Sequence, residues 1–235
     1  MNFIKRNILT ENEVKAVNKF LRECEWVDGL QTAPGFTYDR KNNLEAVPCE
    51  QYSEANKIIM ASLDRDISFF EFCVPDISNA CLFSKTGEGG FYKPHHDNGA
   101  NGHYSTTVFL TDPQDYQGGE LCLYIDGREK MFKPPAGTAI TYSTGILHRV
   151  NEVTSGERTV AVFWTKSRFD DPFERDIFRD ISLAISKLER RETHDTFKDA
   201  LEDPYFILQE VQNKLIRKSL RQVCLLYTSD AADEL

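Results

Sequence analysis

The chain has 235 residues, a formal net charge of −9 and an isoelectric point near 5.1. Hydrophobic residues make up 40% and charged residues 28%, a composition typical of globular proteins and not of disordered chains. The acidic balance argues against a nucleic-acid partner, because sequence-independent binding to phosphates needs a basic face. No apolar run reaches the roughly 18 residues of a membrane span or resembles a signal-peptide core, so we expect no membrane contact and a cytoplasmic location.

Helical patterns occupy the two ends of the chain. A capping box, Thr10-Glu11-Asn12-Glu13, is followed by apolar residues at helical spacing. A helical stripe of apolar residues returns after Pro172, once a long β-rich stretch has ended. The sequence therefore predicts helices over residues 10–24 and 53–66, a third after residue 172, and a last one over 204–221.

The middle of the chain has a different period. Asp126-Gly127 separates two of its β-rich runs and predicts a tight hairpin. Short strands without helices between them indicate a barrel or sandwich, so we expect a mainly β protein with flanking helices. The predicted strands are Ala80–Ser84, Thr106–Thr111, Glu120–Ile125, Glu129–Lys133, Thr138–Tyr142, Leu147–Asn151 and Thr159–Lys166.

These patterns divide the chain into four parts. The predicted parts are a helical region packed on the core at 1–75, a β domain at 76–170, carboxy-terminal helices at 171–222 and a tail at 223–235. The tail breaks the helical pattern before it and has the look of a gene-model artefact or a disordered end.

Histidine and aspartate occur two residues apart at His95 and Asp97. Residues i and i+2 of a strand or its edge point to the same side, so both side chains can face one metal ion. His148 heads a predicted strand 51 residues later and is the candidate for a third ligand. Two histidines and one carboxylate leave open coordination positions, the arrangement of non-haem Fe(II) oxygenases.

Arg158 stands at the start of the last predicted strand, ten residues after His148. A 2-oxo acid that chelates iron through one end needs a partner for its far carboxylate. The guanidinium group binds a carboxylate as a two-pronged fork, so Arg158 is the candidate for this role.

Together these residues resemble the PKHD-type iron and 2-oxoglutarate-dependent hydroxylases, within the prolyl-4-hydroxylase-like class. The resemblance covers about residues 3–190. Its amino-terminal part consists of Trp26-Val27-Asp28-Gly29, Thr32-Ala33 and Lys41-Asn42-Asn43. Its catalytic part consists of Phe109–Pro113, Tyr116, Gly118–Leu121, Pro135–Gly137, Tyr142, Leu147–Val150, Val153-Thr154, Gly156, Arg158 and Phe163-Trp164, in addition to the metal ligands.

The resemblance implies a double-stranded β-helix, or jelly roll, in which His95, Asp97 and His148 hold Fe(II) and Arg158 binds 2-oxoglutarate. It also implies ascorbate as the reductant that keeps the iron ferrous. The expected reaction is hydroxylation of a substrate with O₂, with release of succinate and CO₂. Tyr92 and Tyr142 are either hydroxyl contacts to the co-substrate or packed aromatics of their strands.

Several points stay open at this stage. Gly102-His103-Tyr104 replaces an Arg-x-Asp usual in the family, and the usual Asn-Arg is missing from Asn79–Ser84. These departures leave the substrate undefined among peptide side chains, amino acids and small metabolites, and the oligomeric state is not predicted. His96 and His103 are candidates for the substrate entrance and not for ligands. The alternative function is a non-catalytic metal-binding jelly roll that senses or stores.

Overall fold

The computed structural model describes residues 2–32, 39–188 and 203–229. Ala33 of the amino-terminal signature and residues 230–235 of the expected tail lie outside these ranges. The chain forms two compact units. The first consists of Met1–Phe70 and Pro75–Lys166, and the second of Glu71–Val74 and Ser167–Leu235.

The strands are β1 (Phe3–Asn7), β2 (Trp26–Asp28), β3 (Lys41–Asn42), β4 (Leu44–Ala46), β5 (Pro75–Ser78), β6 (Leu82–Thr86), β7 (Phe91–His95), β8 (Tyr104–Phe109), β9 (Tyr116–Gly118), β10 (Leu121–Ile125), β11 (Arg128–Phe132), β12 (Thr138–Ser143), β13 (His148–Val150), β14 (Val153–Gly156) and β15 (Arg158–Ser167). The α-helices are α1 (Glu11–Arg22), α2 (Glu50–Asp64), α3 (Ile67–Cys73), α4 (Pro172–Lys187) and α6 (Pro204–Ser229). Two short 3₁₀ turns cover Gly29–Thr32 and Gly99–Asn101.

Locally encoded elements agree with the sequence. Each of the seven predicted strands is present with its ends within two residues of those expected. Asp126 and Gly127 have φ values of 53° and 73°, the left-handed pair that a tight β10–β11 hairpin requires. The capping box also forms: the Thr10 side chain accepts from the Glu13 backbone N–H, and the Glu13 carboxylate accepts from Thr10 N at 2.8 Å.

Some elements differ from the expectation. Strands β1 to β5, β7, β9 and β14 and helix α3 were not predicted, because these short segments carry little periodic signal and form by pairing or packing with distant parts of the chain. Helix α2 begins at Glu50 and not at residue 53, since the Cys49 side chain already accepts from a backbone N–H of its first turn. Helix α6 continues to Ser229, beyond the predicted end at 221, and residues 222–229 contain no glycine or proline that would end a helix.

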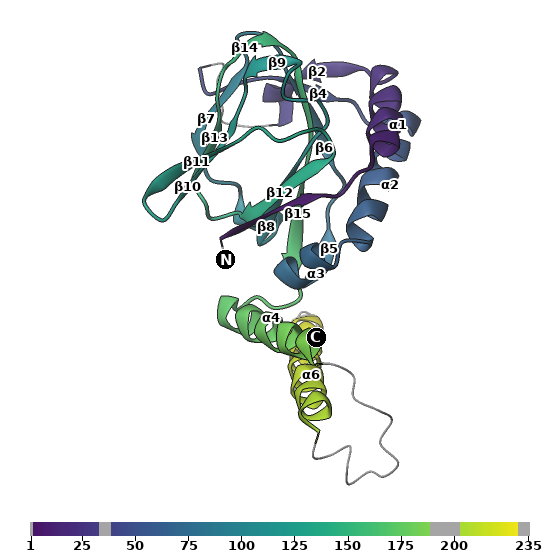
Figure 1. Cartoon of the computed structure of the whole chain (residues 1–235), viewed down its shortest axis with the longest axis vertical. Helices are drawn as coiled ribbons and strands as arrows, with labels where there is room; N and C mark the ends of the chain where they lie inside the picture. The colour runs from purple at the N-terminus through teal and green to yellow at the C-terminus, as the bar shows by residue number, and fades with distance from the viewer. Residues whose placement is uncertain (1, 33–38, 189–202, 230–235) are drawn as a thin grey trace. The chain divides into compact units, whose positions relative to one another are not determined.

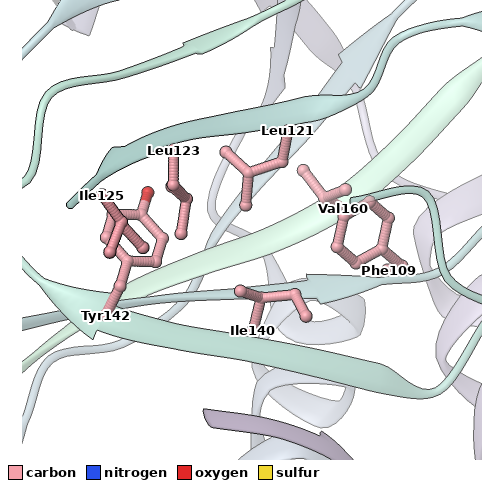
Figure 2. Close-up of a cluster of buried hydrophobic side chains, with 7 residues drawn as sticks. All are labelled: Phe109, Leu121, Leu123, Ile125, Ile140, Tyr142 and Val160. Atoms are coloured by element: carbon pink, nitrogen blue, oxygen red, sulfur yellow. The ribbon is translucent and has the colours of Figure 1, made fainter. Parts of the chain in front are cut away.

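Two sheets face each other in the first unit. The larger has the strand order β1-β12-β8-β15-β6-β4-β2 with β5 added on β15, and the smaller has the order β11-β10-β13-β7-β3. Strands β9 and β14 form a separate pair. Figure 2 shows apolar side chains from β10 meeting those from β8, β12 and β15 between the sheets. This buried cluster consists of Phe109, Leu121, Leu123, Ile125, Ile140, Tyr142 and Val160.

The alternation along β15 separates the inside of the barrel from its outside. Arg158, Val160, Val162 and Trp164 line an internal cavity, whereas Phe163 is fully buried on the opposite face and contacts the Phe69 ring. Helices α1 and α2 lie side by side beside the larger sheet (Figure 1). Helices therefore lie beside the outer face of the larger sheet, and the alternate β15 residues on its inner face line the cavity.

The second unit has a small core of its own. Val74, Phe169 and Phe178 are buried together, with Leu215 and Ile216 of α6 packed against them. None of the helices in the described residues has the length and apolarity needed to cross a bilayer.

Candidate active site

Three side chains predicted as metal ligands converge in the first unit. His95 is the last residue of β7, His148 is the first residue of β13, and the two pair directly across these antiparallel strands. Asp97 lies two residues beyond the end of β7. One potential ligand atom from each residue lies within 4.8 Å of the others. The His95 Nε2 to Asp97 Oδ1 distance is 3.9 Å, and His148 Nε2 to Asp97 Oδ2 is 3.8 Å.

Backbone carbonyls orient both imidazole rings. His95 Nδ1 lies 2.8 Å from the Lys93 carbonyl oxygen, and His148 Nδ1 lies 2.9 Å from that of Ile146. A carbonyl can only accept, so in each ring Nδ1–H donates and Nε2 carries the free lone pair. Both free lone pairs therefore belong to the nitrogens that face Asp97, and such outer hydrogen bonds are typical of metal-ligating histidines.

The electrostatics of the cluster suit metal ligation. Burial, with a smaller contribution from His148, lowers the pKa of His95 to about 4, so this ring is neutral at physiological pH. Ser105 donates a hydrogen bond to Asp97 Oδ2, which holds the carboxylate in place beyond the strand end. Two imidazoles and one carboxylate, all little exposed, form a donor set that accepts a divalent transition metal.

A cavity of about 550 Å³ extends from this cluster into the barrel and is lined by Arg158. The Arg158 side chain is buried, with the residue only 3% exposed, and its guanidinium carbon lies 5.2 Å from the centre of the Phe109 ring. Its Nε has no hydrogen-bond partner in the described residues. Burial lowers the pKa of Arg158, but a guanidinium group stays protonated in proteins. A buried cation in an open cavity is a site for an anion, so the residues present fit a carboxylate-bearing co-substrate.

The two candidate tyrosines occupy different places. Tyr142 is fully buried, its hydroxyl bonds with Thr107, and its ring stands edge-on to His148 at 5.1 Å. Burial raises the pKa of Tyr142, so it stays a protonated phenol, and it lines the same cavity as the metal cluster and Arg158. Tyr92 stacks on His95 with ring centroids 3.7 Å apart, and burial raises its pKa to about 12. Both tyrosines line the cavity, with Tyr142 beside His148 and Tyr92 against His95.

The cavity wall includes residues whose role sequence reasoning missed. Lys41 and Glu45 form an ion pair of 2.6 Å and are almost completely buried, and the Lys41 ammonium also donates to the Gly29 carbonyl. The Lys41-Asn42-Asn43 motif marks the family but has no spacing that assigns it to a cavity. Trp164 also lines this wall, with a buried indole N–H that has no partner in the described residues.

The remaining histidine candidates separate clearly. His96 lines the cavity and its Nδ1 lies 3.0 Å from the Gly145 carbonyl oxygen, and it is not part of the cluster of three ligands. His103 is not among the residues that line the cavity in the described part of the chain. Of the two, His96 is the one that lines the cavity in the described residues.

Comparison with known proteins agrees with this geometry. Residues 81–166 match the family model of the 2OG-Fe(II) oxygenase superfamily. A PKHD-type hydroxylase of Thermosynechococcus vestitus is 33% identical over 220 residues, which cover 90% of this chain and 95% of the relative. The chain belongs to the PKHD-type hydroxylases. A further PKHD-type hydroxylase, from Gluconacetobacter diazotrophicus, is 32% identical over 196 residues, 79% of this chain and 86% of the relative.

Solved structures confirm the predicted jelly-roll fold of this PKHD-type hydroxylase. A prolyl hydroxylase of Trichoplax adhaerens, solved with a hypoxia inducible factor peptide, matches with a TM-score of 0.60 at 17% identity. That match covers 71% of this chain and 84% of the other. A 2OG-Fe(II) oxygenase family oxidoreductase of Burkholderia pseudomallei matches with a TM-score of 0.56 at 15% identity, over 70% and 85% of the two chains.

Family membership confirms the predicted class of activity. The protein is an Fe(II)- and 2-oxoglutarate-dependent dioxygenase of the hydroxylase type, with a substrate that is not identified. The alternative of a non-catalytic metal-binding protein is set aside by the hydroxylase family.

Proposed function

We propose that His95, Asp97 and His148 hold the Fe(II) of this hydroxylase and that Arg158 binds the far carboxylate of 2-oxoglutarate. The observation that carries the proposal is that one cavity is lined both by the three converging ligands and by a buried arginine. When bound, the iron and 2-oxoglutarate activate O₂ for insertion into a substrate C–H bond, with succinate and CO₂ as the other products. The protein's own part is to orient the metal and the co-substrate and to exclude water from them.

Each residue has a separate task in this arrangement. The backbone-anchored imidazoles present Nε2, and Asp97 supplies the negative charge that favours a divalent ion. Arg158 neutralises the distal carboxylate, and the Tyr142 phenol lies beside it as a donor to the co-substrate. Tyr92 holds the orientation of the His95 ring by stacking on it. A contact between the Tyr92 hydroxyl and the co-substrate is a second role proposed for this residue.

Three finer assignments complete the proposal. The cavity mouth admits a peptide side chain, a free amino acid or a small metabolite, with His96 beside the entrance. Ascorbate serves as the reductant that returns oxidised iron to Fe(II), as the family resemblance implies. The five free cysteines among the described side chains favour a reducing compartment, and we assign the protein to the cytoplasm with no nucleic-acid or membrane partner.

An anaerobic titration tests the site. Fe(II) and then 2-oxoglutarate are added to the purified protein, and the metal-to-ligand charge-transfer absorption is recorded. Air is then admitted in the presence of each of a panel of substrates, and succinate is measured. We expect one iron per chain in the wild type, little in His148→Ala, and full stoichiometry in the control His96→Ala, since His96 is not a ligand. Equal iron binding by all three proteins contradicts the ligand assignment. Turnover with and without ascorbate tests the reductant.

A further inference from the structure

Arg158 lies against a turn that has no role in the function proposed above. Tyr116 begins β9 and is followed by Gly118, Gly119 and Glu120, a motif that is distinctive in the sequence. Tyr116 is only 2% exposed and is not among the described residues that line the cavity, although its side chain lies close to that of Arg158. A direct contact with the co-substrate is therefore not its task.

Glycine backbone geometry brings the two side chains together. Gly119 has a φ of 67°, and a Cβ there would stand 3.0 Å from Tyr116 Cε2 and 3.1 Å from Arg158 Cδ. Gly156, two residues before Arg158, has a φ of 81°, and its Cβ would stand 2.3 Å from the Asp115 carbonyl oxygen. Both positions need the left-handed conformation and lack room for a side chain. The turn is thus pressed against the strand that carries Arg158.

Other residues fix Tyr116 in this place. Lys133 donates to the Tyr116 carbonyl oxygen at 2.7 Å, and its ammonium lies 4.2 Å from the centre of the Tyr116 ring. On Arg158 itself, the Phe109 ring lies 5.2 Å from the guanidinium carbon. The tyrosine and the arginine are therefore each held from a second direction, which limits their freedom to separate.

Two orphaned polar atoms meet at this contact. The Tyr116 hydroxyl and Arg158 Nε are both buried without a well-formed hydrogen bond in the described residues. They are complementary, because Nε–H can only donate and a phenol oxygen can accept. The hydroxyl is close enough to the guanidinium for each to favour the other electrostatically, and the Glu120 carboxylate adds to the attraction on Arg158. Buried polar groups without partners are rare in proteins, so a hydroxyl and an Nε–H that lie close together and both lack a partner point to a hydrogen bond between them.

We propose that Tyr116 is a positioning residue for co-substrate binding, whose hydroxyl accepts a hydrogen bond from Arg158 Nε while the two terminal nitrogens of the guanidinium grip the far carboxylate of 2-oxoglutarate. The inference rests on the proposed role of Arg158. A fork held at Nε presents its two outer nitrogens in one fixed plane, which a free guanidinium does not. The Tyr-x-Gly-Gly-Glu turn is then the support of the carboxylate anchor.

The test measures co-substrate affinity in Fe(II)-loaded protein under anaerobic conditions. Tyr116→Phe removes only the hydroxyl, and we expect 2-oxoglutarate to bind about three- to tenfold more weakly, the range for one hydrogen bond. Binding of 2-oxobutanoate, which chelates a metal in the same way but lacks the far carboxylate, should be unchanged. The control Tyr52→Phe alters a half-buried tyrosine whose hydroxyl donates to the Cys81 carbonyl and which is not among the described residues that line the cavity, and it should leave both affinities unchanged.

A double substitution separates positioning from packing. In Arg158→Lys no Nε–H exists, so adding Tyr116→Phe should weaken 2-oxoglutarate further by less than about twofold. An equal loss in both backgrounds, or a loss for 2-oxobutanoate as well, overturns the inference and makes Tyr116 a packing residue. If Arg158→Lys weakens 2-oxoglutarate and Tyr116→Phe does not, this inference fails while the proposed function stands. If Arg158→Lys has no effect, both fail.

Discussion

Replacing Arg158 by lysine keeps the positive charge but removes the fork. The native guanidinium is buried and lies against the Phe109 ring at the inner end of the cavity. Lysine places a single point charge on a flexible stem, so it makes at most one directed contact with a carboxylate where arginine makes two parallel ones. The perturbation is therefore specific to co-substrate recognition.

The expected magnitude follows from the loss of one charge-assisted hydrogen bond. Such a bond contributes about 1.5–3 kcal/mol, and burial at 3% exposure argues against strong weakening by solvent. Each 1.4 kcal/mol is a factor of ten, so 2-oxoglutarate should bind about ten- to a hundredfold more weakly. Fe(II) affinity should be nearly unchanged, because Arg158 does not belong to the cluster of three ligands.

The assay is a pair of anaerobic spectroscopic titrations, one with Fe(II) and one with 2-oxoglutarate on the iron-loaded protein. Arg6→Lys is a matched control, because Arg6 is half exposed and pairs with Asp66 at 3.0 Å, away from the cavity. Thermal melting of both variants shows whether loss of the contact with Phe109 lowers the stability of the fold. The reasoning predicts a split, in which the co-substrate constant moves and the metal constant does not. Unchanged 2-oxoglutarate affinity in a folded variant refutes the anchor role.

Three further predictions follow from the other assignments. Asp97→Ala should lose Fe(II) binding and succinate production while circular dichroism stays native, because only two neutral imidazoles remain; retained iron stoichiometry contradicts this. Deleting residues 223–235 should change neither the thermal midpoint nor turnover, and a loss of several degrees would mean that the segment packs on the fold. In Glu13→Gln the amide oxygen can still accept from the Thr10 N–H, but the negative charge at the helix N-terminus, which pairs with Arg65 at 2.7 Å, is lost, so stability at pH 7 should fall by about 0.3–1 kcal/mol. Because the backbone N–H of Thr10 lowers the pKa of Glu13, its contribution is present above the unfolded pKa and is lost at lower pH, so urea midpoints of variant and wild type should converge below about pH 4.

Much of the fold follows from local patterns. The α1 capping box forms as expected, because its two hydrogen bonds join residues only three positions apart. The Asp126-Gly127 turn is equally local, since left-handed backbone is easiest for these residue types. Strand β1 escaped prediction because Phe3–Asn7 becomes a strand by pairing with β12, which lies more than 130 residues further along the chain.

The site shows the same division. The sequence by itself predicted the kinds of ligand, since the His95-x-Asp97 spacing and a distant histidine before a strand suggest a two-histidine, one-carboxylate set. The alternation argument was not what placed Asp97, which lies beyond β7 and is held by Ser105 from β8. Side-chain hydrogen bonds of this kind depend on how strands pair and not on strand period.

What only the tertiary structure decided is which distant residues share the cavity. The pairing of His95 with His148 depends on the register of β7 against β13, and a slip by one residue would turn one ring to the other face. Likewise, Lys41 and Glu45 are only four residues apart, but their strands β3 and β4 pair with β7 and β6. Tyr116 comes close to Arg158 because β9 pairs with β14. Composition and spacing carry no information on such contacts, because they are selected by packing of the whole core and not by any local preference.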